Sequence, residues 1–310
     1  MKQHNFGAIV LLLFINVLLI EARSALTYTF SGGRFGDNLL TYCRTKWMEY
    51  QTKIRIKYIP FLYSDYLMMH ILEEPLSQDW QQQFKGVISY QQANGWFDPN
   101  SDILYVIPFF PESVWERNCP RNPYLFDVNW NDPEFRKELR KMIKPIGYIN
   151  PFSLPQDCIT IAVHVRRGTG FDIFPGQTFA DIMQRQPFKW PPDSFYIENI
   201  KKIADIFLHE KIYVYIFTDH DNPLEIMEYY QQAINDDRIS FDCRRYQNKH
   251  DLNVLEDFFA LTQFDCLIRP DSHFSFIASL ITDYKIVIAP AHAIEKDGQI
   301  VIDQIVQEYR

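Results

Sequence analysis

The sequence contains few cysteines, and none of them is closely paired. Its 310 residues include five cysteines, with no C-x-x-C spacing among them. Such spacings are typical of structural zinc sites, so a site of that kind is not indicated. The odd number leaves at least one thiol without a disulfide partner in the chain, and a disulfide scaffold is therefore not expected. The cysteines are Cys43, Cys119, Cys158, Cys243 and Cys266.

The chain also lacks an excess of basic residues. Lysine and arginine total 31 against 39 aspartates and glutamates, which gives a formal net charge of −8. Proteins that bind nucleic acid over a broad surface are usually basic, so that class is disfavoured. A local basic site for a phosphorylated ligand remains compatible with this balance. Hydrophobic residues make up 47% of the chain, enough for one large domain or two of ordinary size.

The apolar run at the N-terminus is shorter than the roughly 20 residues of a typical membrane-spanning helix. It covers residues 6–20, follows the basic Lys2, and precedes a small-x-small pattern at residues 22–24. This arrangement predicts a secretory signal in residues 1–25, either cleaved or retained as a short anchor. A buried first helix is the alternative. The sequence has no N-x-S/T acceptor, so glycosylation gives no support for passage through the endoplasmic reticulum.

Strands and helices are predicted to alternate, most regularly in the second half of the chain. Strands are expected at residues 27–30, 54–60, 159–165, 212–219, 238–241, 266–270 and 285–290, the last as the final strand. Helices are expected at residues 39–53, 133–144, 193–209, 224–234, 251–262 and 272–281. The alternation indicates a doubly wound parallel sheet. We expect an N-terminal half at 26–155, with irregular segments and short helices in its middle, a linker at 150–157, and a C-terminal half at 156–310.

Two adjacent arginines follow the strand predicted at residues 159–165. Arg166 and Arg167 repel each other unless an anion or a carboxylate lies close to them, and guanidinium groups suit phosphate. His164 is expected to share the strand face of Arg166, because side chains alternate along a strand. The pattern predicts an anion site at the strand's carboxyl end. Ion pairing with nearby Asp or Glu residues is the alternative interpretation.

Two further segments lie between a predicted strand and a predicted helix. The first, residues 31–38, reads SGGRFGDN, and its three glycines allow backbone N–H groups to approach a ligand. The second begins at Arg269 and reads RPDSHFSF; the hydroxyls of Ser272 and Ser275, with the first N–H groups of the helix, would form an anion cradle. A tight turn and an ordinary capped helix are the alternatives. Together with Arg166, these segments predict a site for one diphosphate.

These motifs occur in a recognisable order. The chain contains, in sequence, GGRFGDN, HVRRG, FTDHD, LEDFFAL, DSHFSFIASL and IVIAP. This set resembles the GDP-fucose-dependent fucosyltransferases, the α1,2/α1,6/protein O-fucosyltransferase group, and its motif pattern is most similar to the α1,2 branch. The resemblance covers about Gly32 to Pro290, although residues 63–155 match no motif.

The resemblance implies an α/β, GT-B-like fold of two Rossmann-like halves with a nucleotide-sugar cleft between them. It implies inverting, metal-independent transfer of L-fucose from GDP-β-L-fucose to a hydroxyl of a glycan or glycoprotein, with no further cofactor. With the predicted leader, it implies an enzyme of the Golgi or endoplasmic reticulum, either lumenal or held by residues 6–20. Asp219 and Asp221 with an intervening histidine could instead hold a divalent ion, but the resemblance favours a nucleotide-binding role for this segment.

The resemblance also implies roles for individual residues. Arg166 would bind the β-phosphate and stabilise the departing GDP, His164 would contact guanine or ribose, and Arg167 would support the site. The remaining nucleotide-sugar contacts would come from the glycine loop, an acidic residue near guanine and the start of the helix predicted at 272–281. They are Gly33, Phe35, Gly36, Asn38, Asp257, Ser272, Phe274 and Ser275.

The chain departs from the family pattern at several positions. Asp37-Asn38 replaces Asn-Gln, Thr169-Gly170 replaces Asp-Tyr, His273 stands where serine is common, and Ile277 where tryptophan is common. Asp37 is a candidate general base for the acceptor hydroxyl, with capping of the next helix as its alternative role. The departures leave the acceptor and the linkage open. The alternative functions are an inactive GDP-sugar or glycan-binding protein of the same fold and an unrelated phosphate-handling α/β protein.

Overall fold

The computed structural model describes residues 23–30, 32–93, 96–108, 128–149, 152–167, 176–245 and 251–309. The predicted leader up to residue 22 and the Thr169-Gly170 departure lie outside these residues. Within the described ranges, no helix is long and apolar enough to cross a membrane. The described cysteines, Cys43, Cys158, Cys243 and Cys266, carry free thiols.

The chain divides into two compact units whose segments are interleaved. Unit 1 comprises residues up to Gly32, Thr41–Pro60 and His70–Asn129; unit 2 comprises Gly33–Leu40, Phe61–Met69 and Trp130–Arg310. The sequence analysis instead expected one boundary near residue 155. The interleaving follows from helix α2, Phe35–Thr52, whose first residues belong to unit 2 and whose later residues belong to unit 1.

Unit 1 contains a small parallel sheet of three strands in the order β1-β5-β4. A separate parallel pair, β2-β3, lies outside it. The elements of this unit are short because residues 63–107 carry little regular periodicity. They are β1 Ala25–Tyr28, β2 Lys57–Tyr58, α3 Met69–Leu72, β3 Glu74–Pro75, α4 Trp80–Gln83, β4 Gly86–Ser89, α5 Tyr90–Ala93 and β5 Ile103–Ile107.

Unit 2 is built on a six-stranded sheet in the order β11-β10-β9-β6-β7-β8. Strands β6 to β10 run parallel, so the predicted doubly wound sheet is confirmed for this unit. Each of these strands is followed by a helix or, at the edge, by the last hairpin. The strands are β6 Ile159–Val165, β7 Ile212–Thr218, β8 Ile239–Cys243, β9 Cys266–Ile268, β10 Ile286–Lys296 and β11 Gln299–Tyr309.

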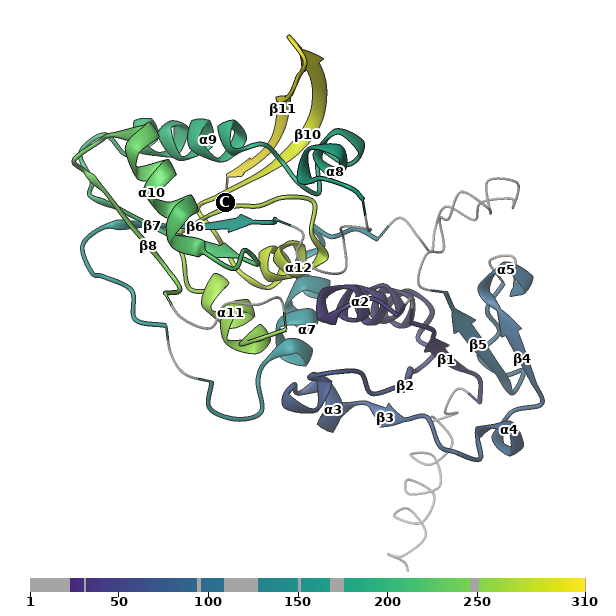
Figure 1. Cartoon of the computed structure of the whole chain (residues 1–310). Coiled ribbons are helices and arrows are strands. Elements are labelled where there is room, and N and C mark those ends of the chain that lie inside the picture. Colours follow the sequence, from purple (N-terminus) through teal and green to yellow (C-terminus); the bar gives the residue numbers. More distant parts are fainter. Residues whose placement is uncertain are drawn as a thin grey trace, which may run out of the picture. The chain divides into compact units, whose positions relative to one another are not determined.

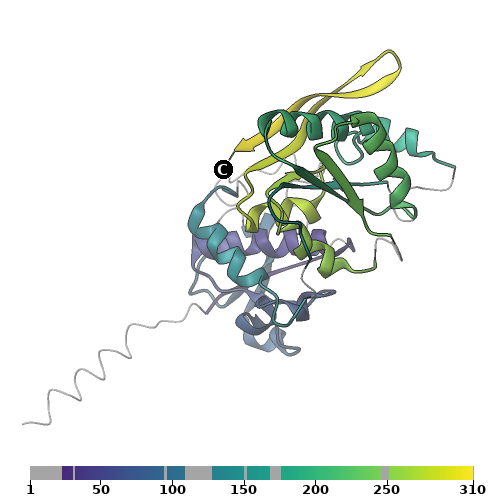
Figure 2. The same ribbon diagram turned by 90° about the vertical axis from the view of Figure 1, so that its left-hand side faces the viewer.

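Helices cover both faces of this sheet (Figures 1 and 2). Helices α9 and α10 lie over one face, where they bury Ile161, Val163 and Val165 of β6 in the main apolar core. Helices α11 and α12 lie over the other face, toward which the alternate residues of β6 point. The helices of unit 2 are α7 Pro133–Ile143, α8 Phe179–Arg185, α9 Asp193–Ile206, α10 Pro223–Ile234, α11 Val254–Leu261 and α12 His273–Ile281, with a 3-10 turn at Ser64–Tyr66.

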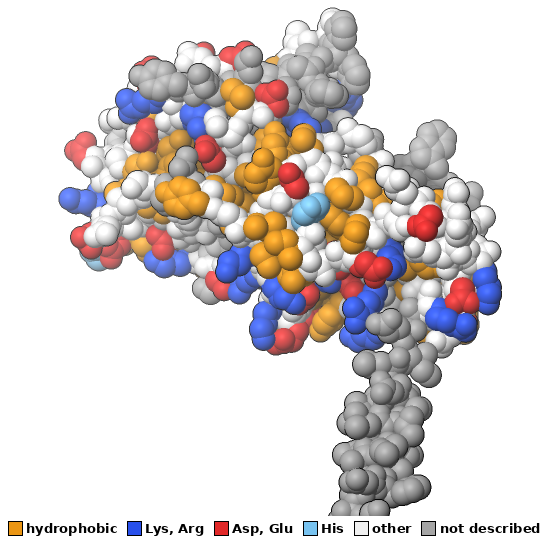
Figure 3. Space-filling model, turned by 90° about the horizontal axis from the view of Figure 1, so that it is seen from below, with side chains coloured by type: hydrophobic (Ala, Val, Ile, Leu, Met, Phe, Trp, Pro, Cys, Tyr) orange, Lys and Arg blue, Asp and Glu red, His pale blue; other side chains and the backbone are white. Residues whose placement is uncertain are grey.

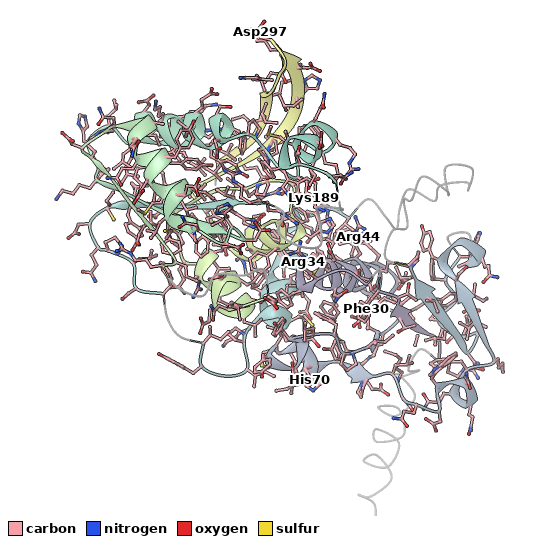
Figure 4. All side chains as sticks on the ribbon, in the orientation of Figure 1. Phe30, Arg34, Arg44, His70, Lys189 and Asp297 are labelled. Carbon is pink, nitrogen blue, oxygen red and sulfur yellow. The ribbon has the colours of Figure 1, made fainter. Side chains whose placement is uncertain are left out.

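The chain ends in a long hairpin that the sequence analysis did not predict. Strand β10 pairs with β9 only through Ile286–Ile288, and its outer part pairs with β11 alone. Asp297 and Gly298 form the tip with φ angles of 53° and 75°, the left-handed geometry of a tight hairpin turn (Figure 4). The predicted final strand at 285–290 was therefore only the inner half of β10.

The surface mixes apolar and charged side chains. Figure 3 shows orange hydrophobic groups scattered among red and blue charged groups on the face it presents. Large apolar side chains that remain exposed in unit 2 include Leu62 and Tyr66, at 67% and 57%. Single exposed apolar residues are normal on globular proteins, so they indicate no particular site.

Candidate functional site

The strand order reverses at β6 and β9, so a ligand site is expected at the carboxyl ends of these two strands. The chain runs from β6 outward to β7 and β8, and later returns to the other side of β6 through β9 and β10. Ligands of open α/β sheets bind beyond the strand ends at such a reversal of order. Arg166 and Arg167 follow β6, and Arg269 follows β9. The sequence analysis quoted Arg269 but assigned it no role, because the adjacency of β6 and β9 emerges only in the sheet.

The two adjacent arginines have different surroundings. The guanidinium of Arg167 forms an ion pair with Asp193, and the backbone N–H of Arg167 donates to Asp219 Oδ1 at 2.6 Å. Tyr230 donates its hydroxyl to the same Asp193 carboxylate at 2.6 Å. The Arg167 side chain is only 11% exposed. Arg167 therefore holds the end of β6 against α9 and α10.

Arg166 lies against the aromatic ring of Trp190. Its guanidinium carbon is 5.5 Å from the ring centroid of Trp190, a side chain that is almost completely buried. Lys189 Nζ lies 4.4 Å from the centroid of the same ring. Both cations therefore add positive charge beside Trp190. The sequence analysis had not identified Trp190 as part of the site.

His164 is a neutral histidine inside this positive region. Its Nδ1 lies 2.8 Å from the Ser275 hydroxyl. Burial, and then the charges of Arg166, Arg269 and Arg34, lower the pKa of His164 to about 3. These arginines are thus close enough to act together on one ring. Three guanidinium groups around the end of a strand make a site that favours an anion.

Helix α12 begins at this site. Ser272 is its N-cap residue and makes no side-chain capping bond, while the Ser275 hydroxyl is buried and contacts both His164 and the Ser272 carbonyl. Phe274 packs against the ring of His164 at 5.9 Å. Ser275 and Phe274 therefore position His164, and the first N–H groups of α12 supply a partial positive charge at the strand ends.

The N-terminus of α2 meets the N-terminus of α12. Arg34 is the N-cap of α2, since its carbonyl accepts the first helical bonds from the N–H groups of Asp37 and Asn38. A Cβ atom on Gly36 would lie 2.6 Å from the backbone nitrogen of Phe274, so this position requires glycine. Two positive helix ends and Arg34, labelled in Figure 4, thus lie beside the same strand ends.

Phe35 and Asn38 lie inside the protein and do not line its surface. Phe35 is 3% exposed and forms part of an aromatic cluster with Phe61, Tyr63, Phe258 and Phe274. Asn38 is also buried, and its Nδ2 donates to the Gly33 carbonyl at 3.4 Å. Both side chains fix the shape of the loop that carries Gly33 and Arg34.

Asp37 makes two contacts at the start of α2. Its Oδ2 accepts the N–H of Arg34 at 3.2 Å, which caps the helix. Its Oδ1 lies 2.6 Å from Nδ1 of His273, the first residue of α12. Burial alone would raise the pKa of Asp37, but the hydrogen bond and charge of His273 and the Arg34 N–H together hold that pKa below its usual value.

Asp257 lies in a separate small pocket of unit 2. It forms an ion pair with Arg244, and both side chains line this pocket with Tyr215, Phe217 and Thr218 near the carboxyl end of β7. Burial raises the pKa of Asp257 to about 6, although Arg244 opposes the shift. A carboxylate that lines a pocket and has a strongly shifted pKa is a recognised mark of a functional site.

The FTDHD segment follows β7. Asp219 accepts the backbone N–H of Arg167, and Thr218 Oγ1 accepts the N–H of His220 at 3.2 Å. Across the described ranges, no group of three or more His, Cys, Asp or Glu side chains gathers as a metal site would require. The observed contact of Asp219 is with the backbone of Arg167.

Comparison with known proteins bears on the fold. No model of a protein family matches the sequence, and no curated protein matches it. Among solved structures, a mutant of Arabidopsis thaliana FUT1 in complex with GDP has a TM-score of 0.51 and 13% identity, covering 86% of this chain and 70% of that chain. The expected GT-B-like α/β fold is thereby confirmed, whereas the α1,2 branch is not distinguished.

Two other solved structures are less similar. NodZ α-1,6-fucosyltransferase soaked with GDP-fucose has a TM-score of 0.49 and 12% identity, covering 92% of this chain and 99% of that chain. POFUT1 in complex with GDP-fucose has a TM-score of 0.45 and 11% identity, covering 86% of this chain and 96% of that chain.

Proposed function

We propose that this chain is an inverting, metal-independent fucosyltransferase that moves L-fucose from GDP-β-L-fucose to a hydroxyl of a glycan or glycoprotein. The observation that carries the proposal is the cluster of Arg34, Arg166 and Arg269, whose charges act together on the part-buried His164. The cluster stands where two helix N-termini meet at the switch point of the sheet. The fold shared with GDP-bound FUT1 supports the same activity.

The chemistry of the transfer requires such a cluster. The C1–O bond of the donor breaks through an oxocarbenium-like state, while negative charge grows on the departing diphosphate. Cations fixed at that diphosphate stabilise the transition state more than the ground state. In this proposal Arg166 binds the β-phosphate, and Arg34, Arg269 and the N-terminus of α12 share the remaining charge.

The guanine base would bind beside Asp257. Guanine presents N1–H and the N2 amino group on one edge, and an ionised carboxylate accepts both. Arg244 keeps the Asp257 carboxylate in place.

The enzyme would act in the secretory pathway, in the Golgi or endoplasmic reticulum, as a lumenal or membrane-attached protein. This part of the proposal is based on the leader predicted in residues 1–25.

The test is GDP release by the purified full chain. GDP-fucose and GDP-mannose are each offered with a panel of galactosides and glycopeptides, in the presence of EDTA. Release from GDP-fucose with one acceptor, lost in Arg166→Ala, is the expected result. Binding of GDP-fucose without release across the panel would favour the non-catalytic GDP-sugar-binding alternative. Strict dependence on manganese would contradict the metal-independent mechanism.

A further inference from the structure

Two positions at which the chain departs from the family pattern lie in direct contact. Asp37 and His273 are separated by 236 positions in the sequence, yet Oδ1 of Asp37 lies 2.6 Å from Nδ1 of His273. The other carboxylate oxygen accepts the N–H of Arg34 at 3.2 Å, so the carboxylate is fixed from both sides. A carboxylate held against one ring nitrogen sets the tautomer of a histidine and prepares the other nitrogen to accept a proton.

We propose that His273 is the general base of the transfer reaction, acting through Nε2, and that Asp37 is the residue that positions it. The inference rests on the proposed function. It reassigns the role that the sequence suggested for Asp37, because both oxygens of Asp37 already accept hydrogen bonds. The held carboxylate is a weak base, whereas an imidazole is suited to proton transfer near neutral pH.

Their hydrogen-bond partners separate His273 from the other histidine of the site. His164 is part-buried and its Nδ1 contacts the Ser275 hydroxyl, whereas Nδ1 of His273 contacts the Asp37 carboxylate. The His273 side chain is 31% exposed and the Asp37 side chain 35%, so an acceptor hydroxyl and solvent can both reach the pair. His273 also opens α12, whose N-terminus is proposed to bind the diphosphate, so the pair lies beside the proposed donor site.

Each bond of the step is accounted for. The acceptor oxygen forms a bond to C1 of fucose while its proton passes to Nε2 of His273. The C1–O bond to the β-phosphate breaks, and its electron pair stays on the departing GDP. The imidazolium is stabilised by Asp37 until its proton passes to solvent.

Several charged and titratable groups surround the pair and will shape its pH dependence. Those on the packed elements are Arg34 and Asp37 at the start of α2, Tyr63 beside Phe35, His164 and Arg166 at the end of β6, and Arg269 and Asp271 before α12. Removing the Asp37 carboxylate would take away the group that fixes Nδ1 of His273.

The decisive variant is His273→Asn in the full chain. Its amide nitrogen stands near the place of Nδ1 and keeps a donor for Asp37, but the variant has no group at Nε2. We expect an unchanged Kd for GDP, a kcat about 10²- to 10⁴-fold lower, and loss of the acid limb of the kcat–pH profile. Asp37→Asn should keep part of the activity, because it leaves the His273 ring in place. Imidazole in the buffer should partly restore His273→Ala.

A second Asp–His pair in the same chain provides the matched control. His292 Nδ1 lies 2.7 Å from Asp303 on the terminal hairpin, and His292→Asn should leave kcat and the pH profile unchanged. Undiminished kcat in His273→Asn would overturn the inference, as would loss of GDP binding in parallel with kcat. Failure of the unaltered chain to bind GDP-fucose would instead overturn the proposed function itself.

Discussion

Gly36 on α2 and the backbone of Phe274 on α12 are in contact without any intervening side chain. A Cβ atom at position 36 would stand 2.6 Å from the Phe274 nitrogen and 2.9 Å from its Cα. Backbone atoms cannot move aside as the end of a flexible side chain can. The contact therefore holds two helix N-termini together beside the arginine cluster.

Gly36→Ala should separate these two helix ends. We expect destabilisation by about 1–3 kcal/mol, as for other overpacked sites, together with weaker GDP binding. Chemical denaturation and calorimetric titration with GDP measure the two effects. The control is Gly147→Ala, because a Cβ at that position meets nothing within 4 Å. Equal behaviour of the two variants would contradict the role assigned to the Gly36 contact.

Substitution of the adjacent arginines should have opposite consequences. Arg166→Ala is expected to weaken GDP binding about 10- to 100-fold, the value of a charge-assisted hydrogen bond, and to abolish transfer with little loss of stability. Arg167→Ala should lower the free energy of unfolding by about 2–4 kcal/mol, because it leaves Asp193 without its cation. The expected loss of stability is near the lower end of the losses measured for broken buried ion pairs, because the Asp193 side chain is 37% exposed.

Unfolding curves and GDP titrations of both arginine variants test this contrast. A large loss of stability in Arg166→Ala, with normal affinity in the protein that remains folded, would reverse the assignment. Asp193→Asn should reproduce the instability of Arg167→Ala, because the two side chains form one ion pair.

The affinity for GDP should depend on pH through Asp257. Burial raises the pKa of this carboxyl to about 6, so it is ionised above that pH and protonated below it. Only the ionised form accepts both guanine donors. Affinity should therefore be highest above pH 6 and should fall as the pH decreases through 6. Asp257→Asn should bind weakly at every pH, and an unchanged pH profile in that variant would exclude Asp257 as the cause.

Unit 1 contains a buried network of charged side chains, and we expect the stability of the protein to depend on pH through this network. Lys46 Nζ lies 2.5 Å from Glu49 and 2.9 Å from Glu73, and Tyr42 donates its hydroxyl to Glu73 at 2.6 Å. The side chains of Lys46 and Glu73 are 10% and 7% exposed. Burial raises the pKa of Glu49 despite its lysine partner.

Lys46→Met should destabilise the protein by about 3 kcal/mol at pH 8, because two carboxylates lose their cation. Burial raises the pKa of Glu49 and Lys46 opposes that shift, so in the variant the pKa of Glu49 should rise further. Glu49 then takes up a proton as the pH falls, which removes the unpaired charge, and the destabilisation should be smaller at pH 5. Urea unfolding at both pH values measures it. The control is Lys85→Met. Lys85 forms an ion pair with Asp102, but its side chain is 73% exposed, so this substitution should change the stability by less than about 1 kcal/mol.

Helices and strands were predictable where the apolar residues repeat with one regular spacing along the whole element. Strand β6 occupies the predicted residues 159–165, and α7 ends one residue before the predicted end at 144. The hairpin after β10 was missed, although Asp297-Gly298 is a typical turn signal. Strands β3 and β4 of unit 1 were also missed, because two to four residues are too few to show a period.

The sequence by itself determined the sheet of unit 2 and the chemistry at its strand ends, because alternation and helical spacing reflect backbone geometry over a few residues. It also identified Arg166, His164 and the glycine loop as candidate parts of the site. Tertiary structure alone decided that Arg167 pairs with Asp193 while Arg166 lies on Trp190. It likewise joined Asp37 to His273 across 236 positions. Such contacts depend on strand order and helix packing, and no local pattern records which distant side chains will meet.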